Sequence, residues 1–237
     1  MSTLTLIRHA RASFLDDDYD KLSPQGFEQA RALGAWLASE PGRVDAVWGG
    51  PLRRHRETCE AAREAAEAAG QAWPEPVTLD ALTEHQGEAL LKAVVPPLVG
   101  SDPTVRGMVK ALDKHSPDFA RHFQRLFEHI TRRWITGELG APGVESWAKF
   151  RGRVGEAVEH IMAEAGRGQR VLAFTSAGVV GAGVAHVLEL NDPRTLELTW
   201  MLYNASLSDL QFSTGRASLA GFNRIPHLRD PKMRTWR

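Results

Sequence analysis

The stretch that decides the fold is an apolar run that ends in an Arg-His pair and small residues, Leu4-Thr5-Leu6-Ile7-Arg8-His9-Ala10-Arg11-Ala12-Ser13. Its first four residues have the length and the β-branched content of a short buried strand. Arg8 and His9 then lie at the carboxyl end of that strand, where open α/β sheets bind their ligands. An imidazole at this place can attack phosphorus while neighbouring guanidinium groups hold the phosphate oxygens. A histidine that only caps a loop is the alternative interpretation.

The composition is that of a globular protein. The 237 residues suit one large domain or a core domain with an insertion, and 43% of them are hydrophobic. Basic and acidic residues balance at 29 each, so the net charge predicts no general affinity for nucleic acid or for a membrane surface. Cys59 is the single cysteine, which excludes an internal disulfide and a thiolate metal cluster. Because no apolar stretch could span a bilayer and Arg8 interrupts the first apolar run, we expect a cytoplasmic protein without a signal peptide.

Strands and helices alternate along most of the chain. Besides the first strand, the expected strands are 44–48, 77–79, 170–174 and the two arms of a hairpin, 206–212 and 217–222. The expected helices are 24–39, 52–69, about 143–165 and 177–188. Ser23 followed by Pro24 is a start signal for the first of these helices. From about 85 to 144 the alternation is lost and helical stretches, including 118–136, predict an insertion.

Two helix starts have the properties of anion sites. The helix at 52–69 carries Arg53, Arg54 and Arg56 in its first turns, where positive charge opposes the helix dipole unless an anion is bound. The turn Thr175-Ser176-Ala177-Gly178 follows a buried strand and precedes a helix, so its free backbone N–H groups can receive an anion.

These motifs, in this order, resemble the histidine phosphatase superfamily in its phosphoglycerate mutase-like branch. Residues 6–10 resemble the family's strand-borne Arg-His-Gly signature, and Asp18-Tyr19-Asp20 and Leu22-Ser23 resemble its continuation. Residues 51–58 resemble the segment with the second phosphate-binding arginine, which falls on Arg54. Residues 82–84 resemble the segment with the family's acid, Glu84, and residues 143–153 resemble the helix after its insertion. Residues 204–208 and 222–228 resemble the tail of a phosphatase-like subgroup.

The resemblance implies both a fold and a reaction. The implied fold is a three-layer α/β/α sandwich with a mostly parallel central sheet, forming a single domain over 1–237 with a helical insertion at about 85–144 as a cap near the active site. The implied reaction is phosphomonoester hydrolysis without a metal or another cofactor. His9 would attack phosphorus, Glu84 would protonate the leaving alcohol, and Arg8 and Arg54 would hold the phosphate. Ser176 and the amide of Ala177 would complete the phosphate site.

The chain departs from the family pattern at two positions. Ala10 replaces the glycine that follows the histidine, which is tolerable unless the position needs a positive φ. Ser176 replaces a second histidine, which the family carries in a Ser-His-Gly-Gly turn. A hydroxyl still donates one hydrogen bond, but it brings no positive charge. His85, directly after Glu84, is a candidate to replace that histidine, and His55 is another.

Several alternatives stay open at this point. A catalytically impaired phosphoester-binding protein would keep the fold and the pocket, and Ser176 is the reason to consider it. A phosphoglycerate mutase-type phosphotransferase is a further alternative. Arg11 and Ser13 are candidates to contact the rest of a small phosphoester substrate. The residues of the insertion would select that substrate, and the hairpin or the long insertion helix could form a homodimer.

Overall fold

The computed structural model describes residues 1–13 and 20–236, and the description below covers these residues. The Asp18-Tyr19 part of the motif after the first strand lies outside them. The described chain forms two compact units, one from residues 1–84 and 153–237 and the other from residues 85–152. The insertion expected at about 85–144 falls within the second unit.

The first unit contains a six-stranded sheet with the strand order β3-β2-β4-β1-β5-β6. The strands are β1 Ser2–Arg8, β2 Ala46–Gly49, β3 Val77–Thr78, β4 Arg170–Thr175, β5 Leu207–Ser213 and β6 Arg216–Arg224. The first four are parallel, and the hairpin of β5 and β6 joins β1 antiparallel. The expected mostly parallel sheet is therefore confirmed, and its carboxyl edge lies where β1, β2, β3 and β4 all end.

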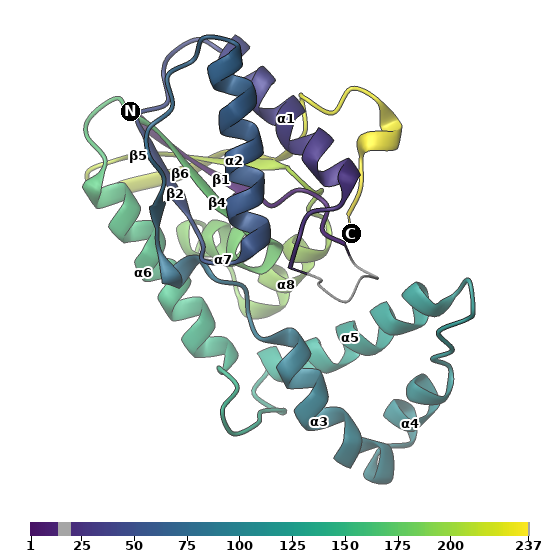
Figure 1. The fold of residues 1–237 in the computed structure, drawn as a ribbon. Helices are drawn as coiled ribbons and strands as arrows, with labels where there is room; N and C mark the ends of the chain where they lie inside the picture. The colour runs from purple at the N-terminus through teal and green to yellow at the C-terminus, as the bar shows by residue number, and fades with distance from the viewer. Residues whose placement is uncertain (14–19, 237) are drawn as a thin grey trace. The chain divides into compact units, whose positions relative to one another are not determined.

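Helices cover both faces of this sheet (Figure 1). On one face lie α1 Pro24–Ser39 and α2 Arg53–Ala68, and on the other lie α7 Ala177–Val187 and the later part of α6 Trp147–Glu164. Adjacent strand residues point to opposite faces, and β1 shows this directly. Ile7 packs in the same core cluster as Leu33 of α1. Leu6 lies beside α7, with its Cδ1 3.0 Å from where a Cβ on Gly183 would be. The three-layer α/β/α sandwich is confirmed.

Local signals set the helix starts. Ser23 accepts a hydrogen bond of 3.1 Å from the N–H of Gly26, so it caps α1 as its sequence predicts. The sequence analysis missed α8 Asp192–Trp200, which Asn191 caps by accepting from the N–H of Arg194. Only Thr195 and Leu196 of α8 are buried, so the apolar periodicity that reveals a helix is weak there.

The second unit is helical, with α3 Gly87–Ser101, α4 Pro103–Lys110 and α5 Phe119–Ile135, and it includes the start of α6. α3 continues through Pro96 and Pro97, although proline inside a helix normally breaks or kinks it. Asp102 caps α4 through the N–H of Thr104 and also pairs with Arg133 of α5 at 2.8 Å. This ion pair joins the start of α4 to α5.

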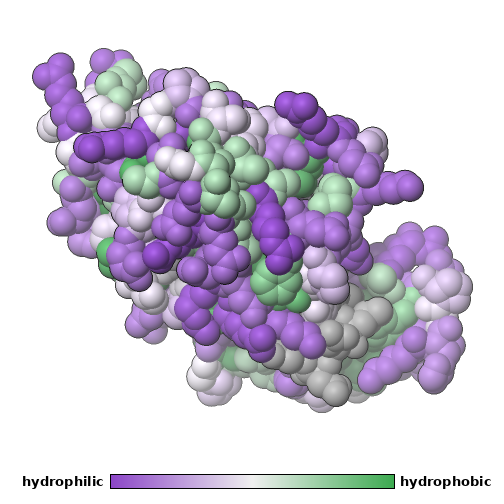
Figure 2. Space-filling view, turned by 45° about the horizontal axis from the view of Figure 1, so that its top comes forward, coloured by the Kyte–Doolittle hydropathy of each residue, from purple (hydrophilic) through white to green (hydrophobic). Residues whose placement is uncertain are grey.

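The face of the molecule in Figure 2 is largely hydrophilic, and its apolar residues form separate patches among charged ones. No helix in the described ranges is long and apolar enough to cross a membrane.

Candidate active site

The candidate site residues of the first unit follow the carboxyl ends of the parallel strands. His9 follows β1, Arg54 follows β2, Glu84 follows β3 and Ser176 follows β4. Open α/β sheets bind ligands at this edge. His9 and Ser176 are 167 residues apart in the chain, but they lie at the same edge of the sheet. The reason is that β1 and β4 pair side by side, from Thr3↔Arg170 to Arg8↔Thr175.

The backbone of His9 is fixed on both sides. Its N–H donates to the carbonyl oxygen of Thr175 at 2.7 Å, and its own carbonyl oxygen accepts from the N–H of Ala205 at 3.2 Å. Only 5% of the residue is exposed. The last residue of β4 and a residue just before β5, the two strands that flank β1, therefore hold this histidine in place.

The hydrogen bonding of the His9 ring defines which nitrogen is reactive. Nδ1 lies 2.7 Å from the carbonyl oxygen of Ala10, which can only accept, so Nδ1 carries the hydrogen. Nε2 is then the nitrogen with the lone pair. Burial holds the pKa of His9 well below its usual range, and the charges of Arg54 and Arg8 lower it further, with a smaller contribution from His55. The ring is therefore a neutral potential nucleophile among positive charges.

Two guanidinium groups provide this positive charge. Arg8 donates through Nη1 to the carbonyl oxygen of Leu202. Arg54 is 7% exposed, donates to Oδ1 of Asp20 at 2.7 Å and also lies 3.3 Å from Oγ of Ser176. After burial, the positive charges of Arg54 and Arg8 contribute most to lowering the pKa of the His9 ring. Such an arrangement favours an anion beside the imidazole.

Thr58 of α2 links the loop after β1 to the helix that carries Arg54. Its Oγ1 accepts from the N–H of Ala10 at 3.0 Å and donates to the carbonyl oxygen of Arg54 at 2.6 Å. Ala10 is fully buried and is not among the residues with positive φ. Alanine therefore fits the position where the family pattern has glycine.

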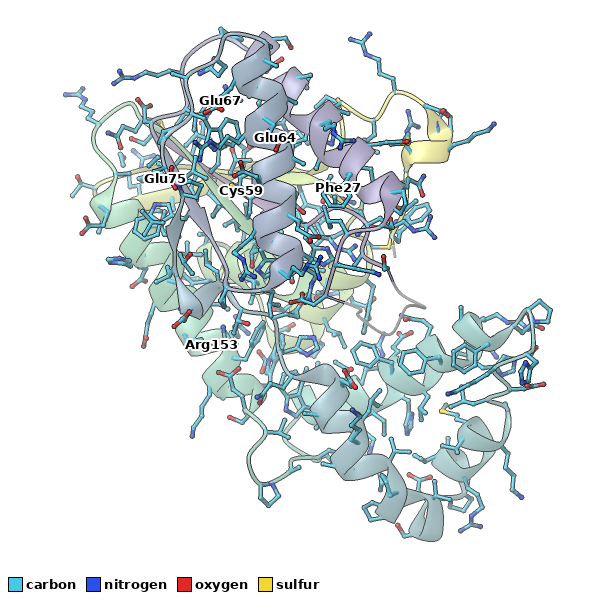
Figure 3. All side chains as sticks on the ribbon, in the orientation of Figure 1. Phe27, Cys59, Glu64, Glu67, Glu75 and Arg153 are labelled. Atoms are coloured by element: carbon cyan, nitrogen blue, oxygen red, sulfur yellow. The ribbon has the colours of Figure 1, made fainter. Side chains whose placement is uncertain are left out.

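Three hydrogen bonds anchor the segment that carries Glu84. Thr175 donates from Oγ1 to the carbonyl oxygen of Leu82 at 2.7 Å. Arg153 of α6, labelled in Figure 3, donates from Nη1 to the carbonyl oxygens of Ala81 and Thr83; these two distances are 2.7 and 2.9 Å. The sequence analysis gave Arg153 no role, because a guanidinium that binds backbone carbonyls leaves no side-chain motif on the partner segment.

The carboxylate of Glu84 reaches the start of α7. Its Oε2 accepts from the N–H of Gly178 at 2.9 Å. The sequence analysis expected the amides of Ala177 and Gly178 to be available to a phosphate. The amide of Gly178 is instead bound to Glu84, which corrects that expectation, because a helix N-terminus attracts the negative charge of a carboxylate as it does that of a phosphate.

Ser176 contacts α2 and does not cap its own helix. It is 1% exposed, and its side chain accepts no hydrogen bond from the first turn of α7. Its Oγ lies 2.6 Å from Nε2 of His55, a residue that is completely buried. His55, one of the two histidines considered as replacements at this position, thus contacts Ser176 directly.

The remaining candidates have other surroundings. His85 belongs to the unit 85–152, where its ring packs against Phe127, Trp134 and Phe150 with centroid separations of 6.2, 5.3 and 5.6 Å. The guanidinium of Arg11 donates to Gln25 of α1. Ser13 is buried, and its N–H donates to the carbonyl oxygen of Lys21 at 2.9 Å. In the part of the chain that the structure describes, no group of three His, Cys, Asp or Glu side chains is placed to hold a metal ion.

Comparison with known families and curated proteins gives one match. The sequence model of the histidine phosphatase superfamily (branch 1) matches residues 4–89 and 111–225. No curated protein is significantly similar to the chain.

Solved structures share the fold at low sequence identity. A phosphoserine phosphatase from Entamoeba histolytica, in complex with 3-phosphoglyceric acid, is 18% identical with a TM-score of 0.63, and the match covers 96% of this chain and 100% of that one. A mycobacterial glucosyl-3-phosphoglycerate phosphatase in complex with VO3 is 18% identical with a TM-score of 0.63, over 93% and 98% of the two chains. A phosphoglycerate mutase from Bacillus anthracis is 16% identical with a TM-score of 0.64, over 95% and 94%.

Proposed function

Since the chain belongs to branch 1 of the histidine phosphatase superfamily, we propose that it hydrolyses a small phosphomonoester through a phosphohistidine formed on His9. The observation that carries the proposal is the His9 ring: its Nδ1–H donates to the carbonyl oxygen of Ala10, which leaves the lone pair on Nε2, and the charges of Arg54 and Arg8 act on the ring. A binding protein needs the positive charge but not a neutral imidazole with a free lone pair.

In the first step of this reaction, Nε2 of His9 forms a bond to phosphorus as the bond from phosphorus to the alcohol oxygen breaks. The guanidinium groups of Arg8 and Arg54 neutralise the phosphoryl oxygens, which is the main requirement of phosphoryl transfer. Glu84 in its protonated form gives its proton to the leaving oxygen. The alcohol departs, and phosphate remains on His9.

In the second step, water attacks phosphorus and passes a proton to the carboxylate of Glu84. The bond from phosphorus to Nε2 breaks, its electron pair returns to the imidazole, and inorganic phosphate leaves. Glu84 serves as acid and then as base, which its position directly after the anchored segment 81–83 supports.

The test is steady-state hydrolysis of p-nitrophenyl phosphate in EDTA from pH 4 to 8. We expect turnover by the wild type, none by His9→Ala and a large loss in Glu84→Gln. His115→Ala changes an exposed histidine and serves as the matched control. Phosphohistidine trapped by rapid quenching in base, and absent from His9→Ala, identifies the intermediate.

The second candidate is a phosphoester-binding protein without turnover, which the neutral side chain of Ser176 favours. In that case the wild type is as inactive as His9→Ala against a panel of phosphoesters, while inorganic phosphate still binds. A mutase would instead interconvert the phosphoglycerates, so these are included in the panel.

A further inference from the structure

The side chain of Ser176 is held by two residues of α2. Arg54 approaches its Oγ through Nη2 at 3.3 Å, and Nε2 of His55 lies 2.6 Å from the same atom. Serine at a helix start normally accepts from the backbone of the first turn, and Ser176 does not. Its hydroxyl is therefore directed to the neighbours of His9 and away from its own helix.

The loop after β2 makes room for the His55 ring. A Cβ built at Gly50 would lie 2.4 Å from Nδ1 of His55, closer than side chains approach one another. A glycine at this position thus permits a histidine at position 55. The ring is completely buried and its centroid lies 5.9 Å from that of His9. The imidazole consequently occupies the site itself, although its chain position is 121 residues from Ser176.

The number of hydrogens at Ser176 limits how this contact can work. A guanidinium can only donate, so Oγ of Ser176 accepts from Arg54. The hydroxyl has one hydrogen of its own, which points either to His55 or into the site. If Nε2 of His55 carries the hydrogen and donates it to Oγ, the hydroxyl hydrogen of Ser176 is left for a phosphoryl oxygen. The other ring nitrogen, Nδ1, lies beside Gly50 and makes no hydrogen bond of normal length and angle within the described residues, as that tautomer requires.

We propose that His55 is a positioning residue that donates from Nε2 to Ser176 and thereby aims the Ser176 hydroxyl at a phosphoryl group on His9. The pair then fills the place of the second histidine that the family pattern has at position 176. This inference rests on the proposed function, because it assigns the two side chains to the phosphate site of that reaction. No bond to phosphorus is formed or broken by either residue.

The decisive experiment compares kcat and KM of His55→Ala, His55→Gln, Ser176→Ala and the His55→Ala/Ser176→Ala double variant with p-nitrophenyl phosphate. Removing one oxyanion donor lowers kcat by about 100-fold or more, so we expect a loss of that order in each alanine variant. Because His55 acts through Ser176, the double variant should lose no more than either single one. His55→Gln keeps an N–H donor near the same place and should recover part of kcat.

A merely structural role for His55 predicts a different pattern. The losses would then multiply in the double variant, His55→Gln would be no better than His55→Ala, and the melting temperature would fall with kcat; this pattern overturns the proposal. The control is His227→Ala, which removes a half-buried histidine whose ring packs against Trp36. We expect its kcat to equal that of the wild type.

Failure of the proposed function is recognised separately. If the wild type does not turn over any phosphoester, binding of inorganic phosphate is measured by titration calorimetry in the same variants. Weaker binding in both His55→Ala and Ser176→Ala, without a further loss in the double variant, supports the pair as a phosphate-positioning device in a protein without turnover. Unchanged binding in His55→Ala, or no phosphate binding by the wild type, overturns it.

Discussion

Nδ1 of His9 lies 2.7 Å from the carbonyl oxygen of Ala10, and this contact fixes the tautomer of the ring. The bond points the lone pair of Nε2 away from the backbone that holds it. Because the bond is made to the next residue in the chain, the orientation of the ring depends on local geometry and on the burial of Ala10 more than on any distant side chain.

The tautomer and burial of His9 predict how activity depends on pH. Burial first, and then Arg54 and Arg8, hold the pKa of His9 well below 6.5, so the ring stays unprotonated as the pH falls through that value. The acid limb of kcat/KM should therefore lie below pH 6.5. Nitrogen-15 shifts of labelled histidine over the same range check the protonation state of His9 directly. A limb at 6.5 that coincides with protonation of His9 would contradict the assignment.

Arg153 is expected to affect the acid more than the nucleophile. Arg153→Met removes both hydrogen bonds to the segment before Glu84 while keeping the apolar stem. A misplacement of about 1 Å can cost about 100-fold in rate, so we expect kcat to fall between about 10- and 100-fold. The loss should be larger for alkyl phosphates than for p-nitrophenyl phosphate, because poor leaving groups depend more on a proton donor.

The control for this variant is Arg43→Met, which removes an exposed arginine paired with Asp45. Its kcat should match that of the wild type with both substrates. Equal losses in Arg153→Met for good and poor leaving groups would argue against a role through Glu84.

His227 predicts acid sensitivity of the fold. Its ring packs against Trp36, and burial lowers its pKa from 6.5 to about 4. Below pH 6.5 this imidazole binds a proton in the unfolded chain but not in the folded chain, so the free energy of unfolding falls as the pH drops from 6.5 to 4. The pKa difference corresponds to about 3 kcal/mol of unfolding free energy by pH 4. Urea unfolding from pH 4 to 7 should show a shallower loss in His227→Leu than in the wild type; equal slopes would refute the prediction.

Cys59 should be unreactive in the folded protein. It is 4% exposed on the inner side of α2 (Figure 3), and burial raises the pKa of its thiol to about 12. The thiolate is the reactive form, so little of it exists at neutral pH. Ellman's reagent should detect no thiol in the native protein and one per chain in guanidinium chloride. Rapid labelling of the native protein would show that α2 opens readily.

Gly34 allows α1 and α2 to approach closely. A Cβ at this position would lie 2.0 Å from the carbonyl oxygen of Ala62, a backbone atom that cannot rotate away. Gly34→Ala should therefore cost about 3 kcal/mol of unfolding free energy. Gly152→Ala, in α6 with nothing within 4 Å, should instead raise stability by up to about 1 kcal/mol. Thermal melting of both variants tests the contrast, and similar changes in the two would contradict it.

The parts of the fold that could be predicted from the sequence are those with a local cause. The run before Arg8 is a strand because it is apolar and β-branched, and α1 begins at Pro24 because Ser23 caps it. α8 was missed because few of its residues are buried. The bounds of α3 could not be predicted because Pro96 and Pro97 lie inside it, where local signals predict a break.

In the candidate site, too, the features with a local cause could be predicted and those that depend on distant contacts could not. Short motifs pointed to His9, Arg54 and Glu84, each next to a strand end. The contact of His55 with Ser176 could not be ranked above that of other histidines, since it depends on the space beside Gly50 in another loop. The binding of Gly178 to Glu84 depends in the same way on where the segment after β3 ends.

The position of β1 in the sheet also governs when this protein can fold. Of the six strands of this sheet β1 is synthesised first, but its two neighbours begin only at Arg170 and Leu207. Contacts between such distant segments form slowly, and during synthesis β1 has no strand to pair with until β4 has been made. A chain that stops before β5 leaves one edge of β1 unpaired and open to other molecules. Translational pausing or truncation between β4 and β5 should therefore expose this edge to aggregation.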